Sequence, residues 1–289
     1  MKESMENGLI SVVMPAYNRA GTILQSISSI QRQTYRNIEI IVVDDGSVDQ
    51  TETVVRKIRD DRLRYFRYDE NRGACYARNY GADQARGEYL AFQDSDDLWD
   101  ERKLEKQLAF ITGTGADFVF CGMERTEREQ GRSFYYPSCG FDNAKDPLLQ
   151  LLVENAVSTQ TVLMKKQLWG TIRFDRSFRR FQDWDFALQA ASAGCRIAYQ
   201  EEALATSEVL PDSISAVIKE GEAFEHILKK YEALYSRYPA IRAEMYKRTG
   251  NAYRKVDREK AERYYRKSLK CRFRWKTLLR LLFLYLRRS

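Results

Sequence analysis

Histidine is nearly absent from this chain of 289 residues, which contains a single one, His226. His226 lies in a basic stretch near the C-terminal end, far along the chain from the polar motifs described below. A mechanism that uses an imidazole as general base is therefore not expected. If the protein removes a proton from a substrate, a carboxylate has to act as the base.

Cysteine is sparse and shows no pattern. The five cysteines are odd in number, widely separated, and form no C-x-x-C pair. Neither a zinc site nor a disulfide framework is therefore indicated. A reducing, cytosolic setting fits this usage. The five are Cys75, Cys121, Cys139, Cys195 and Cys271.

Long apolar runs are missing as well. No run of 18 apolar residues occurs, and such a run is what a membrane-spanning helix requires. Near the N-terminus a short apolar segment is soon interrupted by Pro15 and the turn-forming Asn18, which is unlike a signal peptide. We therefore expect a cytoplasmic protein that touches a membrane only from its surface, if at all.

Acidic residues are scarce in the C-terminal quarter. Residues 216–289 contain 21 Lys and Arg against 8 Asp and Glu, although the whole chain has a formal net charge of only +7. Residues 1–215 are consequently net acidic. We predict a main domain over 1–215 and a basic helical extension over 216–289. Its charge favours an anionic partner such as phospholipid head groups.

Strand-like and helix-like segments alternate over the first 112 residues. Continuous apolar runs predict strands, and apolar residues at helical spacing predict helices. Alternation of this kind predicts an α/β fold with a parallel sheet and helices on both faces. The expected strands are 10–14, 38–43, 63–68 and 89–93, and the expected helices are 22–33, 49–59, 74–85 and 102–112.

Three polar loops directly follow expected strands. They are Pro15–Asn18, Asp44–Ser47 and Asp94–Asp97. In open parallel sheets, ligands bind beyond the carboxyl ends of the strands, where such loops converge. We therefore expect the three loops to share one rim of the sheet and to form a binding site there.

The third loop carries an unusual density of carboxylates. Asp94, Asp96 and Asp97 lie within four residues, and like charges this close repel unless a cation neutralises them. Carboxylate oxygens are suitable ligands for Mg²⁺ or Mn²⁺. A metal held there can bind a diphosphate and stabilise the charge on a leaving group. Read alone, the same cluster is also compatible with a solvated loop before a helix N-terminus.

A second acidic motif lies downstream in "RRFQDWDFALQAASAG". Asp183 and Asp185 stand just ahead of an apolar helical face. A carboxylate in that position can accept a proton from a hydroxyl group. It can equally serve as the cap of its helix.

Four ordered blocks resemble the family 2 inverting glycosyltransferases, which use nucleotide-sugar donors and have the GT-A fold. The blocks are "SVVMPAYNR", "IEIIVVDDGSVDQT", "NRGACYARNYGADQARGEYLAFQDSDD" and "QDWDFALQAASAG", and they cover about residues 9–205. A lone D-x-D motif is weak evidence, whereas four blocks in the family's order are strong. The resemblance implies a GT-A (Rossmann-like), mixed and mostly parallel sheet flanked by helices, with a C-terminal helical extension.

The resemblance also implies a donor site at the rim. Asp45 corresponds to the acidic residue that holds the nucleotide base, with Asp44 beside it, and Arg72 and Arg78 are candidates for contacts with the base or the phosphates. The implied donor-binding residues are Pro15, Tyr17, Asn18, Asp44, Asp45, Arg72, Arg78, Asp94 and Ser95. Considered without the resemblance, Asp44–Ser47 reads as a plain turn and the two arginines as surface charges.

The resemblance also implies which residues bind the metal and which residue is the catalytic base. The implied ligands of Mn²⁺ or Mg²⁺ are Asp94, Asp96 and Asp97, with Asp96 the residue closest to the donor diphosphate. Asp183 corresponds to the family's catalytic base, which deprotonates the acceptor hydroxyl for in-line attack with inversion. One residue departs from the pattern, since Gln182 stands where the family usually has glutamate.

The activity implied is metal-dependent transfer of a hexosyl or N-acetylhexosaminyl group from a nucleotide-diphosphate sugar. A UDP-sugar is the expected donor, and a hydroxyl of a glycan or a lipid-linked molecule is the expected acceptor, in the synthesis of a cell-surface polysaccharide. Two alternatives remain: a sugar nucleotidyltransferase, and an inactive transferase-like scaffold that acts as a binding module. A nucleotidyltransferase normally has a glycine-rich basic loop near its first strand, and "MPAYNRAG" is a poor example. Nucleic acid is not an expected partner.

The acceptor side is expected within residues 120–215. Ser158, Thr159 and Gln160 lie in a segment that resembles the one preceding the family's base. The aromatic run Phe134–Tyr136 suits either a sugar-stacking surface or ordinary packing.

The extension 216–289 is expected to be helical, with one tetratricopeptide-like helix pair in "TGNAYRKVDREKAERYYRKSLK". Beyond it, an apolar stripe at helical spacing is surrounded by basic residues, so residues 272–289 form a candidate membrane-surface helix. The alternative is that the stripe packs on the protein's own core. The stripe comprises Trp275, Leu278, Leu279, Leu282, Phe283 and Leu286.

Overall fold

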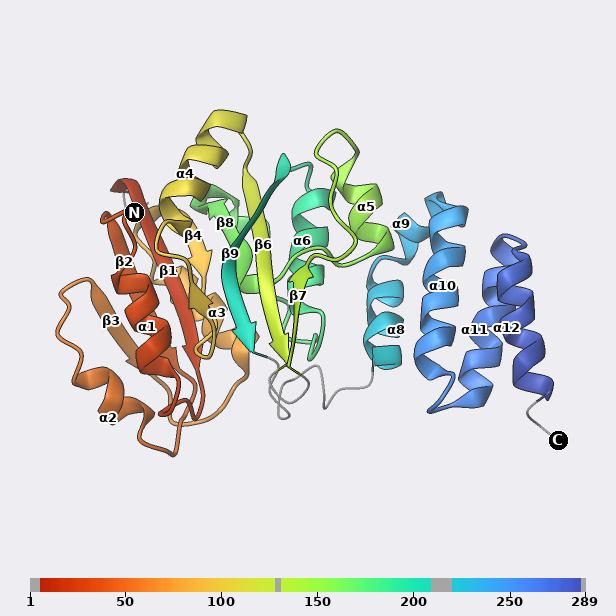
Figure 1. The fold of residues 1–289 in the computed structure, drawn as a ribbon, viewed down its shortest axis with the longest axis horizontal. Helices are drawn as coiled ribbons and strands as arrows, with labels where there is room; N and C mark the ends of the chain where they lie inside the picture. The colour runs from red at the N-terminus through yellow and green to blue at the C-terminus, as the bar shows by residue number, and fades with distance from the viewer. Residues whose placement is uncertain (1–5, 128–130, 209–219, 287–289) are drawn as a thin grey trace. The chain divides into compact units, whose positions relative to one another are not determined.

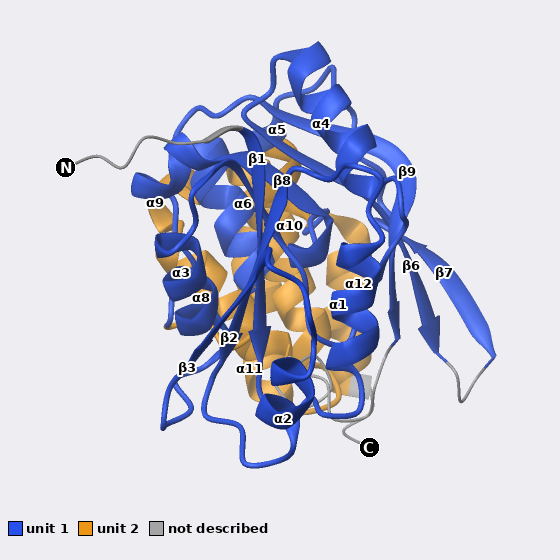
Figure 2. Cartoon of the chain, turned by 90° about the vertical axis from the view of Figure 1, so that its left-hand side faces the viewer, with its two compact units in different colours: residues 1–148, 155–176, 182–210 blue, residues 149–154, 177–181, 211–289 orange. Residues whose placement is uncertain are grey.

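The structure is a computed structural model that describes residues 6–127, 131–208 and 220–286 (Figure 1). The chain forms two compact units (Figure 2). Unit 1 comprises residues 1–148, 155–176 and 182–210, and unit 2 comprises the remainder. The predicted domain boundary at residue 215 lies outside the described residues, so it stays a prediction.

Unit 1 is built on one large mixed sheet. Its strand order is β3-β2-β1-β4-β8-β6-β9-β5, and β7 pairs with β6. The first four strands run parallel, β8 runs antiparallel to both β4 and β6, and β6 and β9 are again parallel. The prediction of a mixed, mostly parallel sheet is confirmed. The strands are β1 (Glu6–Ala16), β2 (Ile38–Asp44), β3 (Leu63–Arg67), β4 (Gly87–Phe92), β5 (Leu98–Trp99), β6 (Phe118–Glu127), β7 (Arg132–Tyr136), β8 (Val162–Lys165) and β9 (Ile197–Glu208).

Helices cover both faces of this sheet (Figure 1). All seven residues of β2 are buried, as expected for a central parallel strand with apolar side chains on both sides. The helices and 3₁₀ turns of the first 192 residues are α1 (Ile23–Gln31), α2 (Thr51–Arg56), α3 (Ala74–Asp83), α4 (Lys103–Thr114), α5 (Pro147–Val153), η2 (Thr159–Thr161), η3 (Lys166–Gly170) and α6 (Gln182–Ser192).

The two faces pack differently. On one face, Ile23, Ile27 and Ile30 of α1 belong to the same buried cluster as Val12 of β1 and Val42 of β2. On the other face, α3 approaches the sheet very closely through a glycine. A Cβ atom at Gly81 would lie 2.5 Å from Cγ1 of Val13. Only a residue without a side chain permits this contact, and the contact brings α3 close to the carboxyl ends of β1 and β2.

A lysine is fully buried beneath the sheet. Lys103, at the start of α4, has no exposed side-chain surface. Its Nζ lies 3.9 Å from the centroid of the Trp99 ring and donates a hydrogen bond of 2.6 Å to Oε1 of Gln107. Burial lowers the pKa of Lys103 to about 8, because desolvation penalises the charged form.

This lysine makes folding stability pH-dependent. Between the lowered pKa of about 8 in the folded state and the ordinary 10.5, the unfolded chain binds more protons, so stability rises with pH. We expect the free energy of unfolding of Lys103→Met minus that of wild type to be about 2 kcal/mol larger near pH 7 than near pH 9.5, so that the variant is relatively more stable at pH 7. Denaturant titrations at the two pH values measure this difference. Lys106→Met in the same helix is the matched control and should show a flat difference; a flat difference for Lys103→Met would contradict the prediction.

Unit 2 is helical. Its helices pack in succession, α8 and α11 each on α10, and α12 on α11. Phe224, Ile227, Tyr235, Met245 and Tyr265 form part of its buried interior. The prediction of a helical C-terminal region is confirmed. The helices are α8 (Glu220–Lys230), α9 (Glu232–Arg237), α10 (Pro239–Tyr253), α11 (Arg258–Cys271) and α12 (Trp275–Leu286).

In the last helix, α12, the buried residues are not those of the predicted stripe. Thr277, Leu281 and Leu284 are buried. Most of the predicted stripe is exposed instead, and the side chain of Leu286 lies outside the described part of the chain. The alternative in which this stripe packs on the protein's own core is therefore wrong for the exposed members. These are Trp275, Leu279, Leu282 and Phe283. Among the helices that the structure describes, none is long and apolar enough to cross a membrane.

Candidate functional site

The three polar loops meet at one rim of the sheet. β1, β2 and β4 are parallel neighbours, so their carboxyl ends lie side by side. The backbone N–H of Asp45 donates to the carbonyl of Ala16 at 2.8 Å, and that of Gln93 donates to the carbonyl of Val13 at 3.0 Å. The convergence expected from the sequence is therefore present.

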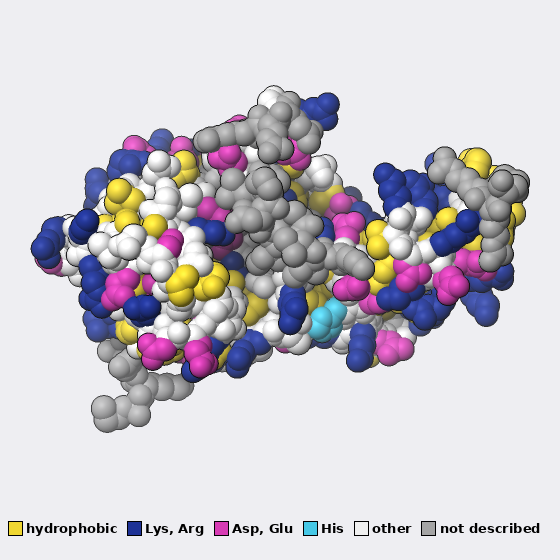
Figure 3. All heavy atoms as spheres, turned by 90° about the horizontal axis from the view of Figure 1, so that it is seen from below, with side chains coloured by type: hydrophobic (Ala, Val, Ile, Leu, Met, Phe, Trp, Pro, Cys, Tyr) yellow, Lys and Arg dark blue, Asp and Glu magenta, His cyan; other side chains and the backbone are white. Residues whose placement is uncertain are grey.

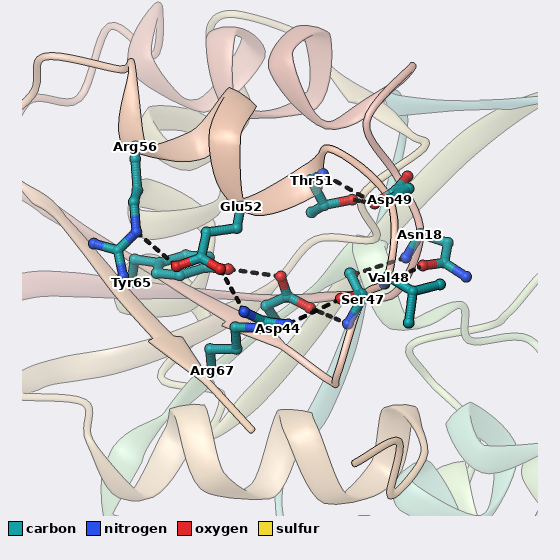
Figure 4. Close-up of polar contacts among 10 residues, drawn as sticks. All are labelled: Asn18, Asp44, Ser47, Val48, Asp49, Thr51, Glu52, Arg56, Tyr65 and Arg67. Atoms are coloured by element: carbon teal, nitrogen blue, oxygen red, sulfur yellow. Dashed lines mark hydrogen bonds and ion pairs between the residues drawn. The ribbon is translucent and has the colours of Figure 1, made fainter. Parts of the chain in front are cut away.

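The first two loops are joined by a reciprocal pair of hydrogen bonds (Figure 4). The backbone N–H of Asn18 donates to Oγ of Ser47 at 2.9 Å, and the backbone N–H of Val48 donates to Oδ1 of Asn18 at 2.9 Å. Asn18 has a φ of 52°, in the left-handed region that asparagine tolerates better than most residues. Asn18 therefore fixes the shape of the turn as well as lining the rim.

Asp44 points into the protein. It is fully buried, and its carboxylate accepts hydrogen bonds from the backbone N–H of Ser47 at 2.8 Å and from the hydroxyl of Tyr65 at 2.6 Å (Figure 4). Burial and the Asp44 carboxylate together raise the pKa of Tyr65, so that hydroxyl stays a donor. Asp44 therefore stabilises the loop from the protein interior and does not face the rim.

Asp45 ties the second loop to the start of α3. It is 2% exposed, and its two oxygens accept hydrogen bonds from the backbone N–H groups of Arg72, at 2.9 Å, and Gly73, at 2.6 Å. Gly73 has a φ of 90°, which requires glycine. Asp45 therefore holds the start of α3 against the second loop.

The other predicted donor-side residues differ in accessibility. Pro15 is a buried residue of β1, paired with Val43. Tyr17 is 42% exposed. Arg72 is exposed, and its guanidinium lies 5.5 Å from the ring centroid of Tyr68 and 5.1 Å from that of Tyr76. An exposed tyrosine and an arginine held on aromatic rings therefore flank the first two loops.

Two carboxylates of the acidic loop face arginines. Oδ1 of Asp94 accepts a hydrogen bond of 2.6 Å from Nη2 of Arg78. Oδ2 of Asp96 lies 3.4 Å from Nη2 of Arg19. Both aspartates keep roughly a quarter of their side-chain surface exposed. They are therefore accessible at the rim.

The third carboxylate, Asp97, is turned inward. It is 5% exposed and accepts a hydrogen bond of 2.5 Å from Nε2 of Gln160. Burial, reinforced by the charges of Asp94 and Asp96, raises the pKa of Asp97 well above its ordinary value, although a hydrogen bond from Ser207 acts in the opposite direction. A buried carboxyl group that is engaged by protein donors is less available to a metal, so the geometry favours Asp94 and Asp96 over Asp97 for that role.

Neighbouring predicted residues share this inward orientation. Ser95 is 5% exposed, so it contributes little surface for a donor. Ser158, Thr159 and Gln160, expected on the acceptor side, are also buried. Ser158 donates to Oε1 of Gln160 at 2.8 Å, which orients the Gln160 amide toward Asp97. The acceptor-side expectation for Gln160 is therefore corrected: this side chain supports the acidic loop.

Arg78 joins the acidic loop to α6. Its side chain is 7% exposed and lies 5.3 Å from the ring centroid of Phe174. Nη2 donates to Asp94, and Nη1 donates to Oε1 of Gln182 at 2.8 Å. The reading of Arg78 as a surface charge is therefore wrong. Because Gln182 is neutral, Asp94 is the only carboxylate in these two hydrogen bonds.

The candidate base, Asp183, lies in the first turn of α6 beside this bridge. Its Oδ1 accepts hydrogen bonds from Nδ2 of Asn155 at 3.1 Å and from the backbone N–H of Trp184 at 2.8 Å. Burial raises the pKa of Asp183, while the Trp184 N–H, the charges of Arg125 and Arg78, and Asn155 oppose this rise. A carboxylate with a raised pKa is a stronger proton acceptor once ionised.

Asp185 does not compete for this role. It is fully buried and accepts a hydrogen bond of 2.7 Å from Nε2 of Gln189 one turn later. Asp183, by contrast, keeps part of its surface exposed. The structure therefore separates two aspartates that the sequence presents as equals.

Three residues of the site are not among those that the sequence predicts. Arg19 faces Asp96, Asn155 donates to Asp183, and Arg125 of β6 acts electrostatically on both Asp97 and Asp183. Arg125 also lies 5.2 Å from the ring centroid of Tyr136. No motif marks Arg125 or Asn155 in the sequence, whereas Arg19 is the last residue of the first block.

The predicted aromatic surface lies on β7, the strand paired with the Arg125 end of β6. Phe134 and Tyr135 are 41% and 39% exposed. Phe134 pairs with Arg125 across the two strands. The hydroxyl of Tyr135 makes a 2.6 Å hydrogen bond with that of Tyr199. The two rings are therefore accessible, as a sugar-stacking surface requires.

The carboxylates of the acidic loop suit a divalent metal that is shared with a substrate. Among the residues that the structure describes, no group of three or more His, Cys, Asp or Glu side chains is arranged to hold a metal ion. Mg²⁺ is commonly held by one or two carboxylates together with substrate phosphates and water. Asp94 and Asp96 provide such a pair, so the residues fit a metal that arrives with a diphosphate.

A mixed sheet with an acidic loop at the carboxyl ends of its parallel strands is the arrangement expected of a GT-A glycosyltransferase. The model of "Glycosyl transferase family 2" matches residues 11–180. The chain belongs to this family, and it is a glycosyltransferase.

Two relatives in sequence carry names that refer to a reaction or a biosynthetic process. A putative teichuronic acid biosynthesis glycosyltransferase of Bacillus subtilis, TuaG, is 31% identical over 72% of this chain and 82% of its own length. The UDP-Glc:alpha-D-GlcNAc-diphosphoundecaprenol beta-1,3-glucosyltransferase WfgD of Escherichia coli is 39% identical over 42% of this chain and 47% of its own length.

Solved structures share the fold. Residues 1–349 of TarS from S. aureus, in complex with UDP-GlcNAc, match with a TM-score of 0.70 at 21% identity, over 91% of this chain and 81% of that chain. The mannosyltransferase PcManGT from Pyrobaculum calidifontis, in complex with GDP-Man and Mn²⁺, matches with a TM-score of 0.62 at 17% identity, over 95% and 78%. Both likenesses support the GT-A architecture.

Proposed function

We propose that this chain is a metal-dependent, inverting glycosyltransferase that moves a sugar from a nucleotide-diphosphate donor to a hydroxyl group. The single observation that carries the proposal is the Arg78 bridge. Arg78 holds Asp94 of the acidic loop and Gln182, the residue next to Asp183, on one guanidinium. The group proposed to hold the diphosphate and the group proposed to remove the proton are thereby kept at a fixed separation.

The donor is held at the rim of the sheet. In this proposal Tyr17, Asn18 and Asp45 bind the nucleoside, and Arg72 contacts the base or the phosphates. Asp94 and Asp96 hold Mn²⁺ or Mg²⁺, which, when bound with the donor, neutralises charge on the departing diphosphate. A UDP-sugar is the proposed donor, and UDP-GlcNAc bound to the TarS fold neighbour is consistent with it.

The proposed reaction is a single displacement. Asp183 removes the proton of the acceptor hydroxyl as its oxygen attacks the anomeric carbon opposite the diphosphate. The new carbon–oxygen bond forms while the bond to the diphosphate oxygen breaks, and the nucleoside diphosphate leaves with that bonding pair. Inversion at the anomeric carbon follows because there is one displacement.

The proposed acceptor is a growing glycan or a lipid-linked sugar used in a cell-surface polysaccharide. Support comes from the names of TuaG and WfgD, which refer to teichuronic acid and to a diphosphoundecaprenol acceptor. The exposed Phe134 and Tyr135 offer stacking surface for a sugar ring. A cytoplasmic enzyme that works at the inner face of the membrane would meet such acceptors.

A donor screen tests the proposal. Binding of UDP-, GDP-, dTDP- and CMP-sugars to the full chain is measured calorimetrically with Mn²⁺, with Mg²⁺ and with a chelator. We expect one nucleotide class to bind only with metal and its sugar to be slowly hydrolysed in the absence of acceptor. Synthesis of a nucleotide sugar from a sugar phosphate would instead indicate a nucleotidyltransferase, and binding of no donor under any condition would favour an inactive scaffold.

A further inference from the structure

We propose that one face of α12 docks unit 2 on an anionic phospholipid surface. The docking face consists of Trp275, Leu279, Leu282 and Phe283, with exposed fractions from 41% to 61%. This inference adds a membrane partner to the proposed function. It rests on the proposed function only for the benefit that docking would bring. The docking face itself follows from the packing and charge of unit 2.

The helix is apolar on two sides. The side that packs inward carries Thr277, Leu281 and Leu284, at positions i, i+4 and i+7. Trp275, Leu279, Leu282 and Phe283 repeat the same helical spacing on the exposed side, at i, i+4, i+7 and i+8. A helix that only completed a helical unit would need one apolar side. The second apolar side is left for another partner.

The charges around the docking face select an anionic partner. Ten basic residues and no acidic residue follow Glu262. Several of these basic residues make contacts within unit 2: Arg274 pairs with Glu244, Arg280 donates to Asn251 at 2.5 Å, and Arg263 and Arg266 pair with Glu225 and Glu262. Lys270, Arg272 and Lys276 are exposed.

Figure 3 shows hydrophobic and basic side chains on the C-terminal helices, with acidic ones among them. The exposed apolar side chains of the docking face, together with the exposed Lys270, Arg272 and Lys276, favour a lipid surface over a second copy of the chain. Two copies meeting through this face would bring the exposed Lys270, Arg272 and Lys276 of each copy together. A bilayer offers apolar depth for the rings and anionic head groups for the lysines and arginines, as for other basic amphipathic helices that lie in the interface.

The arrangement has a functional consequence. A lipid-linked acceptor is confined to the membrane surface, so an enzyme held on that surface meets it at a higher local concentration. Docking through unit 2 would leave the residues of the donor site, all in unit 1, outside the contact residues.

Vesicle flotation with the full chain tests the inference. The vesicles contain either phosphatidylglycerol mixed with phosphatidylethanolamine, or phosphatidylcholine alone. We expect binding to the anionic vesicles and little to the neutral ones. The double variant Trp275→Ser/Phe283→Ser should bind more than about tenfold more weakly. Arg272→Gln/Lys276→Gln should bind about thirtyfold more weakly.

Matched controls come from elsewhere on the chain. Val48→Ser removes an exposed apolar side chain from unit 1, and Arg102→Gln/Arg132→Gln removes two exposed basic ones. Both should bind vesicles as the wild type does. Circular dichroism spectra and thermal unfolding curves of all variants identify any that fail to fold.

Tryptophan fluorescence reports the docking face directly. Trp99, Trp169 and Trp184 are at most 6% exposed, whereas Trp275 is 61% exposed. We expect a blue shift of the emission on anionic vesicles that is lost in Trp275→Phe, although that variant still floats with the vesicles. Flotation without a blue shift in the wild type would overturn the assignment of this face.

Other outcomes also decide the matter. Equal binding of wild type and Trp275→Ser/Phe283→Ser to anionic vesicles would overturn the proposal. So would concentration-dependent dimers abolished by the same substitutions, or salt-sensitive binding of RNA in place of vesicles. These readouts need no turnover, so a failure of docking is distinguishable from a failure of the proposed activity, which the donor screen measures.

Discussion

Asp183→Asn is expected to lower the turnover number about a thousandfold while leaving donor affinity unchanged. Removing a general base typically costs a factor of about 10² to 10⁴. Asparagine preserves the size of the side chain and its acceptor oxygen for Asn155 and the Trp184 N–H, so the fold should be retained. Transfer is measured by release of nucleoside diphosphate with acceptor, and donor affinity by calorimetry. Asp142→Asn, an exposed carboxylate of the same unit, is the matched control.

The pH profile identifies which role Asp183 has. Burial raises the pKa of Asp183 and the charge of Arg125 opposes this rise. A base must be ionised, so activity should fall as the pH drops through this raised pKa. Arg125→Met removes the opposing charge and should move the acid limb of the profile to higher pH. If Asp183 only capped α6, Asp183→Asn would turn over normally and the acid limb would not move in Arg125→Met.

Asp96→Asn is expected to abolish the metal dependence of donor binding. Loss of a group that merely supports a metal ligand typically costs about 10- to 100-fold in metal affinity. Loss of a direct ligand should cost at least about a hundredfold, with a matching loss of turnover. The experiment compares donor affinity with and without Mn²⁺ in wild type and variant.

Two neighbours make this test specific. Asp97 is buried and accepts a hydrogen bond from Gln160, so Asp97→Asn keeps the shape of a side chain that is turned away from the rim. We expect Asp97→Asn to keep metal-dependent donor binding, as should Asp100→Asn, an exposed residue just beyond the loop. Loss of metal dependence in Asp97→Asn would restore Asp97 as a ligand. Unchanged metal dependence in Asp96→Asn would remove Asp96.

Much of the fold could be predicted because its signals are local. Continuous apolar runs such as 38–43 predict buried parallel strands, and the structure places β2 at Ile38–Asp44 with every residue buried. The convergence of the three loops followed from the geometry of parallel strands alone. The antiparallel pairing of β8 with β4 and β6 was not predicted, since its four residues carry no pattern that reveals their partners.

The candidate site was predictable as a set of loops but not as a set of orientations. Asp44, Asp94, Asp96 and Asp97 are chemically alike in the sequence, yet two are turned inward and two remain accessible. The difference arises from contacts with residues far along the chain. Tyr65 donates to Asp44, and Gln160 donates to Asp97. Arg78, read as either a surface charge or a donor contact, became a buried bridge because Asp94 and Gln182 meet on either side of it.

The sequence by itself determined the family, the alternation of strands and helices, and the rim at which the polar loops gather, because motif order, hydrophobic periodicity and strand direction are properties of the linear chain. Tertiary structure alone decided which carboxylates face the rim, which charges act on Asp183, and which side of α12 stays open. These three features depend on burial and on partners that come from distant segments of the chain. The local environment of an ionisable or apolar side chain sets its free energy, and only the fold creates that environment.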